Sequence, residues 1–228
     1  MPKQIQAIET AELIDRLRSD AENFSIGKES KSYLCAYPHF ISYFANIDEH
    51  KIDVEHLTIG IHLVYGWMPT IFEFKGIDAS NSISNINNFA EAIRIINAVK
   101  KGETNLQKTE YTYLKELLNN SLVGTSKLLH FVNPKQYAIW DSRVYRYLYN
   151  KEKVHSYLVE NVDKYQHYLQ LLAELTSHEI TCRICEKVRD VLKAEEFYCE
   201  ISDFRALELL MFTYGKPLNS ANNELVQG

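Results

Sequence analysis

Two residues of opposite charge, Lys127 and Asp141, stand close together in the segment 121–149, SLVGTSKLLHFVNPKQYAIWDSRVYRYLY. Because proline lacks an amide hydrogen and clashes with the preceding turn, Pro134 separates two predicted helices. Asp141 stands at the start of the second helix as an N-cap, where a carboxylate meets the positive end of the helix dipole. An amine and a carboxylate placed in this way suit chemistry at a cationic centre.

The turn Val123–Ser126 opens the first of these helices, which we expect at about 127–131. Its residues Gly124, Thr125 and Ser126 would present free amide hydrogens and hydroxyls to an anion such as phosphate. The alternative is that the turn only caps the helix and holds no ligand.

The pattern Val-Gly-Thr-x-Lys, then a helix, an apolar loop and Asp-x-x-Val, resembles the helix-hairpin-helix DNA glycosylases, especially the 8-oxoguanine type. The resemblance covers roughly residues 121–149. It implies that the hairpin holds a DNA phosphate, that Lys127 attacks the sugar in a bifunctional reaction, and that Asp141 supports the cationic transition state. It also implies two helical lobes that face each other across a cleft, with the hairpin and Asp141 at its mouth, the first lobe mixing N-terminal and C-terminal helices. We therefore expect Lys127 and Asp141 to face a common groove.

Both charged residues also have plainer roles. Capping alone stabilises a helix by about 1 kcal/mol, so Asp141 needs no active site to explain it. Its neighbours Trp140 and Arg143 and the apolar loop 137–140, which would desolvate the carboxylate, favour a function. A nucleophilic lysine must lose its proton, which needs burial or a cationic neighbour. Lys127 is therefore either a catalytic amine or a phosphate contact.

Aromatic and basic residues extend the predicted site. The segment Gly66–Pro69 could be a core turn, or a wedge, because apolar side chains inserted between base steps open a duplex. The chain has 15 tyrosines, which either pack on half-buried helix surfaces or stack on bases. The candidate base contacts are Tyr137, Trp140 and Trp67. The candidate basic residues on the DNA are Arg143 and Arg146.

Composition bounds the class of protein. The chain has 228 residues, 46% hydrophobic and 24% charged, which is ordinary for a globular domain. Its net charge of −5 counts against tight non-specific binding of nucleic acid, which needs lysine and arginine at the phosphates. This acidity favours a second hypothesis, a non-catalytic helical domain that binds nucleic acid or a protein.

Helical periodicity runs through almost the whole chain, so we expect an all-α fold, a single domain of residues 1–228 that can divide into two lobes. Thr10 is the expected cap of the first helix, and Ser177 that of the last but one. The segment Thr70–Phe74 could be a short strand or a loop, and the polar tail 219–228 should fray. The expected helices are Ile8–Phe24, Tyr33–Phe44, Val54–Tyr65, Asn88–Lys100, Thr109–Asn119, 142–149, Val154–Leu175, Ser177–Leu192 and Asp203–Tyr214.

No metal site or membrane segment is predicted. His178, Cys182 and Cys185 share a helix face and could bind zinc with Cys199, but one helix rarely offers three converging ligands, so free thiols are favoured. The chain begins without the apolar core of a secretory signal, and no apolar run reaches membrane-spanning length. We therefore expect a cytoplasmic protein, associated with the nucleoid if it binds DNA.

The residues and the resemblance together predict a DNA N-glycosylase. Such an enzyme extrudes a modified base from double-stranded DNA, because the reacting atom is unreachable in the stack, and cleaves its bond to the sugar. An added lyase step depends on Lys127 being buried. We expect a monomer that needs no cofactor and no metal.

Overall fold

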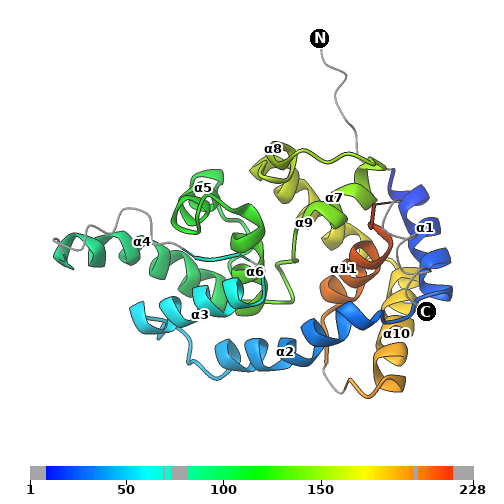
Figure 1. The fold of residues 1–228 in the computed structure, drawn as a ribbon, viewed down its shortest axis with the longest axis horizontal. Coiled ribbons are helices and arrows are strands. Elements are labelled where there is room, and N and C mark those ends of the chain that lie inside the picture. Colours follow the sequence, from blue (N-terminus) through cyan, green and yellow to red (C-terminus); the bar gives the residue numbers. More distant parts are fainter. Residues whose placement is uncertain (1–8, 69, 73–81, 198–199, 218–228) are drawn as a thin grey trace, which may run out of the picture. The chain divides into compact units, whose positions relative to one another are not determined.

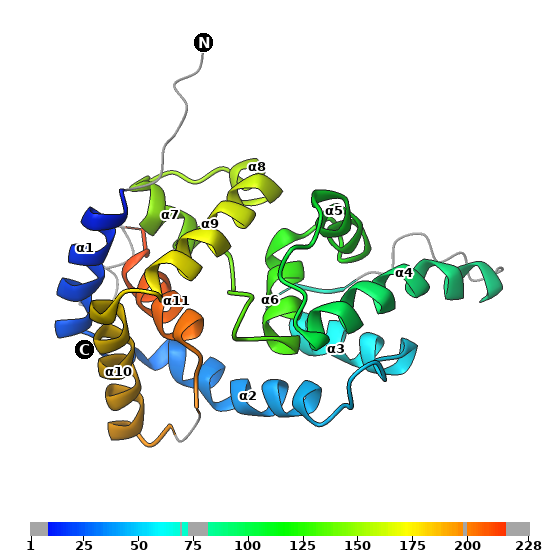
Figure 2. The same cartoon turned by 180° about the vertical axis from the view of Figure 1, so that it is seen from behind.

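The computed structural model describes residues 9–68, 70–72, 82–197 and 200–217. Within these ranges the chain forms eleven helices and no strand, which confirms the all-α prediction (Figures 1 and 2). None of the described helices is both long enough and apolar enough to span a membrane. The predicted tail 219–228 lies outside the described residues.

The chain divides into two compact units. The first unit joins residues 1–26 to residues 140–228, and the second consists of residues 27–139. The first unit is thus built from both ends of the chain. Its helices are α1 (Thr10–Glu22), α7 (Ser142–Tyr149), α8 (Ser156–Val159), α9 (Val162–Leu175), α10 (Glu179–Ala194) and α11 (Asp203–Tyr214). The helices of the second unit are α2 (Lys28–Ala45), α3 (Val54–Gly66), α4 (Ser82–Lys101), α5 (Lys108–Leu117) and α6 (Leu122–Val132).

Helix α11 lies at the centre of the first unit. It packs on α1, α7 and α10, and α1 also packs on α9 and α10 (Figure 1). The helix is buried over eight consecutive residues, 204–211. A helix that is buried all round is the core of its domain, so α11 supplies the surface on which α7 is held.

Helix α6 has the same role in the second unit. It packs on α2, α3, α4 and α5, and nine of its eleven residues are buried. The neighbouring α2 and α3 approach closely at Gly60, where an added Cβ would overlap the ring of Phe44. Glycine is therefore required at this position for space, and the two helices pack ring against backbone.

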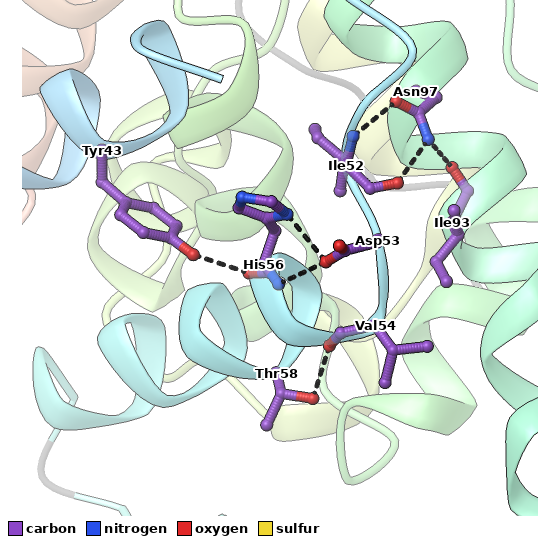
Figure 3. A network of polar contacts seen from close by, with 8 residues as sticks. All are labelled: Tyr43, Ile52, Asp53, Val54, His56, Thr58, Ile93 and Asn97. Carbon is purple, nitrogen blue, oxygen red and sulfur yellow. Dashed lines mark hydrogen bonds and ion pairs between the residues drawn. The ribbon is translucent and has the colours of Figure 1, made fainter. Parts of the chain in front are cut away.

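A polar network fastens the start of α3 to α4 (Figure 3). The side chain of Asp53 caps α3 by accepting the amide hydrogen of His56 at 3.0 Å. On α4, the Asn97 side chain accepts from the amide nitrogen of Ile52 at 3.1 Å and donates to its carbonyl oxygen at 2.8 Å. The Tyr43 hydroxyl, on α2, donates to the carbonyl oxygen of His56 at 3.3 Å.

Several helix boundaries differ from the prediction. The segment expected as one helix from Val154 to Leu175 is two helices, α8 and α9. The break occurs because the side chain of Asn161 accepts the amide hydrogen of Lys164 at 3.2 Å and caps a new helix. Helix α4 begins at Ser82, six residues earlier than expected.

The two predicted caps Thr10 and Ser177 are wrong. Glu9 and His178 are the N-cap residues of α1 and α10, and neither uses its side chain to cap. Residues 70–72 have no regular structure, and the rest of the segment left open as strand or loop lies outside the described residues.

Candidate functional site

Asp141 caps α7, as predicted. Its Oδ1 accepts the amide hydrogens of Arg143 at 2.8 Å and Val144 at 2.9 Å. The residue is half-buried, and within the described part of the chain no hydrogen bond reaches its Oδ2. The carboxylate is therefore oriented by one oxygen, while the second oxygen has no partner among these residues.

Two arginines follow Asp141 on α7, and both are half-buried. The Arg146 guanidinium donates to the carbonyl oxygen of Gly215 at 2.6 Å, and that of Arg143 lies 4.4 Å from the ring centroid of Phe212. Burial lowers the pKa of Arg146, the charge of Arg143 acts in the same direction, and Asp141 opposes them. The predicted basic residues are thus electrostatically coupled to the predicted catalytic carboxylate.

A buried polar group that the sequence did not suggest lies near Asp141. The Tyr168 ring, on α9, is only 1% exposed, and its hydroxyl has no hydrogen-bond partner in the described residues. Burial raises the pKa of Tyr168, and the charges of Glu208 and Asp141 raise it further. Glu208 forms a buried ion pair with Arg205 on α11. The sequence signal for this ion pair is the spacing of Arg205 and Glu208, three residues apart inside an apolar run, which places both charges on one face of a helix.

Trp140 and Tyr137, predicted to contact bases, lie in the cores of their units. The Trp140 indole donates to the carbonyl oxygen of Val159 at 2.8 Å and packs 5.2 Å from the Tyr168 ring. The Tyr137 hydroxyl donates to the carbonyl oxygen of Glu103 at 2.7 Å. Both side chains are fully buried, so packing explains them here, and the base contacts stay predictions.

Lys127 lies on α6 in the second unit, close to Trp67. Its Nζ is 5.4 Å from the ring centroid of Trp67, within the range of a cation–π interaction. Trp67 is 8% exposed, and its ring lies 5.2 Å from that of Phe131. Of the two interpretations of the segment Gly66–Pro69, the core turn agrees with this burial at Trp67.

The predicted turn before α6 is wrong, because Ser121 caps the helix and Leu122 begins it. The hydroxyl of Ser121 accepts the amide hydrogen of Gly124 at 3.0 Å, and its carbonyl oxygen accepts that of Thr125 at 3.0 Å. The hydroxyls of Thr125 and Ser126 donate to backbone carbonyl oxygens one turn earlier. The polar hydrogens predicted to face an anion are thus used in the helix, and the phosphate contact stays a prediction.

The structure groups the predicted residues by unit. Asp141, Arg143 and Arg146 share α7 in the first unit, whereas Lys127 and Trp67 meet in the second. A common groove for Lys127 and Asp141 stays a prediction.

The cysteines of α10 differ in their surroundings. Cys182 is exposed, whereas Cys185 is buried with its Sγ 3.8 Å from the carbonyl oxygen of Asp203. Nowhere in the described ranges do three or more His, Cys, Asp or Glu side chains gather in a way that could hold a metal ion. Cys199 lies outside those ranges.

Comparison with known proteins identifies a family. The model of a domain of unknown function, DUF8425, matches residues 27–202, which is most of the chain. Neither the curated proteins nor the solved structures contain a match. The matched residues include all of the second unit and helices α7–α10, and they leave out α1 and α11. The chain therefore belongs to the DUF8425 family.

Proposed function

We propose that this protein is a DNA N-glycosylase in which Asp141 stabilises positive charge on the sugar as a modified base leaves. The observation that carries the proposal is the geometry of Asp141: two backbone amides fix Oδ1, and Oδ2 accepts no hydrogen bond from the described residues. Base release passes through an oxocarbenium-like transition state. A carboxylate that is already oriented lowers this barrier without reorganising.

The other residues take supporting roles in this proposal. Arg143 and Arg146 contact phosphates of double-stranded DNA, and the two units form lobes about a cleft that also contains Lys127. The ring of Trp67 favours the charged ammonium of Lys127, which supports a phosphate contact over a nucleophilic amine. The enzyme acts as a monomer on DNA in the cytoplasm, at the nucleoid.

Release of the base from a duplex oligonucleotide tests the role of Asp141. The first substrate carries 8-oxoguanine, and a panel with other modified bases follows. Asp141→Asn should keep the cap, because asparagine also caps a helix, yet slow base release by roughly 10²-fold or more. Asp53→Asn is the matched control, since Asp53 caps α3 through the amide of His56. Release at the wild-type rate in Asp141→Asn would leave Asp141 with its capping role alone.

Trapping with borohydride decides the role of Lys127. An amine that attacks C1′ leaves an imine, which the hydride reduces to a stable protein–DNA adduct. Loss of the adduct in Lys127→Gln would assign the nucleophile. Base release without any adduct identifies a monofunctional hydrolase, with Lys127 at a phosphate.

A second candidate is a non-catalytic helical domain that binds nucleic acid or a protein. The net charge of −5 favours it, as does the use of the Gly124 and Thr125 amides inside α6. Binding without base release across the whole panel would select this candidate.

A further inference from the structure

Helices α7, α8 and α9 bring several aromatic rings and a lysine together in the first unit. The rings of Tyr145 and Tyr149 on α7 stack, with their centroids 4.4 Å apart and an angle of 20° between the ring planes. Lys164, on α9, places its Nζ 4.2 Å from the centroid of Tyr149 and 5.6 Å from that of Tyr145. Helix α8 packs on both α7 and α9 (Figure 2).

Lys164 lacks an acidic partner within the described chain. The residue is half-buried, and the two ring contacts are the only interactions that its ammonium makes with those residues. Burial lowers the pKa of Lys164, because partial removal from water disfavours the charged form. A partly desolvated cation of this kind favours an anion that binds from outside.

An exposed aromatic pair lies on the neighbouring helix. Tyr157, on α8, is 69% exposed, whereas Tyr33 is 37% exposed. The ring of His155 stacks on that of Tyr157, with ring centroids 5.7 Å apart and an angle of 18° between the ring planes. A parallel, solvent-exposed pair of rings offers a flat face to a third ring. Such faces are the usual platform for unpaired bases, since every base has a π surface.

The stretch of sequence that leads to the pair is basic. The segment 142–158 contains four lysine or arginine residues and one acidic residue, although the whole chain has a net charge of −5. Lys151 and Lys153 are exposed just before α8. This local charge complements a phosphate backbone and opposes a cationic ligand.

One buried donor adds to the cluster. Tyr145 is fully buried, and its hydroxyl makes no hydrogen bond within the described residues. Burial raises the pKa of Tyr145, and its proximity to Tyr157 raises it further. A hydroxyl without a partner is costly in a core.

We propose that Lys164 and the stacked rings of His155 and Tyr157 form a nucleotide subsite for DNA. The ring pair carries one unpaired base, and Lys164 contacts the phosphate of the same strand. The combination of an unpaired half-buried cation with an exposed ring stack matches a ligand that is both anionic and aromatic. The inference rests on the proposed action on DNA and adds a contact to a strand that has left the duplex.

Binding of a short fluorescent oligothymidylate to the full chain, followed by anisotropy over a range of salt concentrations, tests the subsite. Tyr157→Ala should weaken binding by roughly 5- to 150-fold, the range expected for one stacked base, and Tyr157→Phe should bind like the wild type. Lys164→Gln should reduce the slope of log affinity against log salt by about 0.7, the value for one phosphate of a single strand.

Lys193→Gln is the matched control for charge, because Lys193 lies on α10 of the same unit and pairs with Asp190. It should leave the salt slope unchanged. Thermal melting shows whether Lys164→Gln folds, and the exposed Tyr157 gives a second variant that does not disturb the core.

The outcomes separate this inference from the proposed function. Wild-type binding by Tyr157→Ala and Lys164→Gln, while the enzyme still releases a base, overturns the subsite alone. Weakened binding by both variants without base release on any substrate supports the subsite and overturns the glycosylase. Failure of the wild type to bind the oligonucleotide at low salt overturns the subsite. If the wild type instead binds an acidic protein, the surface belongs to a protein partner.

Discussion

The hydroxyl of Tyr147 donates a hydrogen bond of 2.7 Å to Oδ2 of Asp20, which joins α7 to α1 across 127 positions of sequence. On the same helix α1, Arg16 donates to the carbonyl oxygen of Tyr147 at 2.8 Å and lies 3.8 Å over its ring. Helix α1 is outside the part matched by the family model, residues 27–202. The helix that carries Asp141 is therefore held by an element that precedes the matched region.

Tyr147→Phe should lower the free energy of unfolding by about 2 kcal/mol, the usual value of one hydrogen bond to a charged group. The ring stays buried in the variant, so the loss reports the bond to Asp20 and not the packing. Urea denaturation measures it. Tyr157→Phe is the control, because its hydroxyl makes no hydrogen bond within the described residues, and its midpoint should not move.

Asp141→Ala should destabilise the protein by about 1 kcal/mol, whereas Asp141→Asn should stay within a few tenths of the wild type. The reason is that alanine cannot accept the amide hydrogens of Arg143 and Val144, and asparagine can. Thermal melts of both variants give the comparison. Equal losses in the two variants would mean that the charge, and not the cap, stabilises α7.

The cap at Asp141 was predictable from sequence because capping is local. An aspartate after an apolar loop and before a helical pattern identifies itself within four residues. The start of α6 is also signalled locally, by Ser121 before an apolar run, but the glycine at position 124 favours a turn in the sequence. A glycine inside a helix is tolerated where space is short, and here a Cβ would lie 3.3 Å from the Tyr65 hydroxyl.

The rest of the candidate site depends on contacts that sequence spacing does not show. Tyr168 and Glu208 interact across 40 positions, and only the folding of the first unit brings them near each other. The sequence pattern predicts one long helix for Tyr157 and Lys164, in which a separation of seven residues gives one continuous face. The cap at Asn161 breaks that helix, so the two residues come from different helices, α8 and α9.

Gly215→Ala should destabilise the protein by about 2 kcal/mol or more, as overpacking does. Gly215 has a φ of −85°, so its backbone is open to any residue, and space is the constraint. An added Cβ would overlap the carbonyl oxygen of Arg143 and lie 2.6 Å from that of Met211. Both atoms belong to the backbone and cannot rotate away.

Gly66→Ala serves as the control for Gly215→Ala in the same melting experiment. Gly66 ends α3, and a Cβ there would meet no atom within 4 Å. We expect a neutral effect or a gain of about 0.5 kcal/mol, because alanine loses less backbone entropy on folding. A Gly215→Ala variant as stable as Gly66→Ala would contradict the close approach of α7 to the end of α11.

Glu208→Gln should destabilise the protein by roughly 3 kcal/mol, because it removes the carboxylate that pairs with the buried charge of Arg205. The double variant Arg205→Met with Glu208→Leu should recover most of that loss, since a buried ion pair often contributes little over apolar residues of similar size. A double-mutant cycle in urea measures the coupling. Additive losses in the two single variants would show that the pair does not act as a unit.

The stability of the protein should fall as the pH rises above about 9. Burial raises the pKa of Tyr149 to about 12, and that of the Cys185 thiol also to about 12. In the unfolded chain these groups ionise near their ordinary values of 10.0 and 9.0. At a pH between the pKa values of the unfolded chain and those of the folded protein, the folded state binds more protons than the unfolded state. Increasing pH therefore favours unfolding in this range. Below about pH 9 these groups are protonated in both states, so they cause no loss of stability there.

Urea midpoints at about pH 8 and about pH 10.5 test this expectation, together with the phenolate absorbance across the transition. The absorbance of the buried tyrosines should appear with unfolding and not before it. Tyr149→Phe should reduce the alkaline loss, because phenylalanine has no proton to release in the unfolded state. Tyr157→Phe should leave the loss unchanged, since that ring is 69% exposed in the folded protein. Midpoints that stay constant over this pH range would show that these phenols and the thiol are reached by solvent before the chain unfolds.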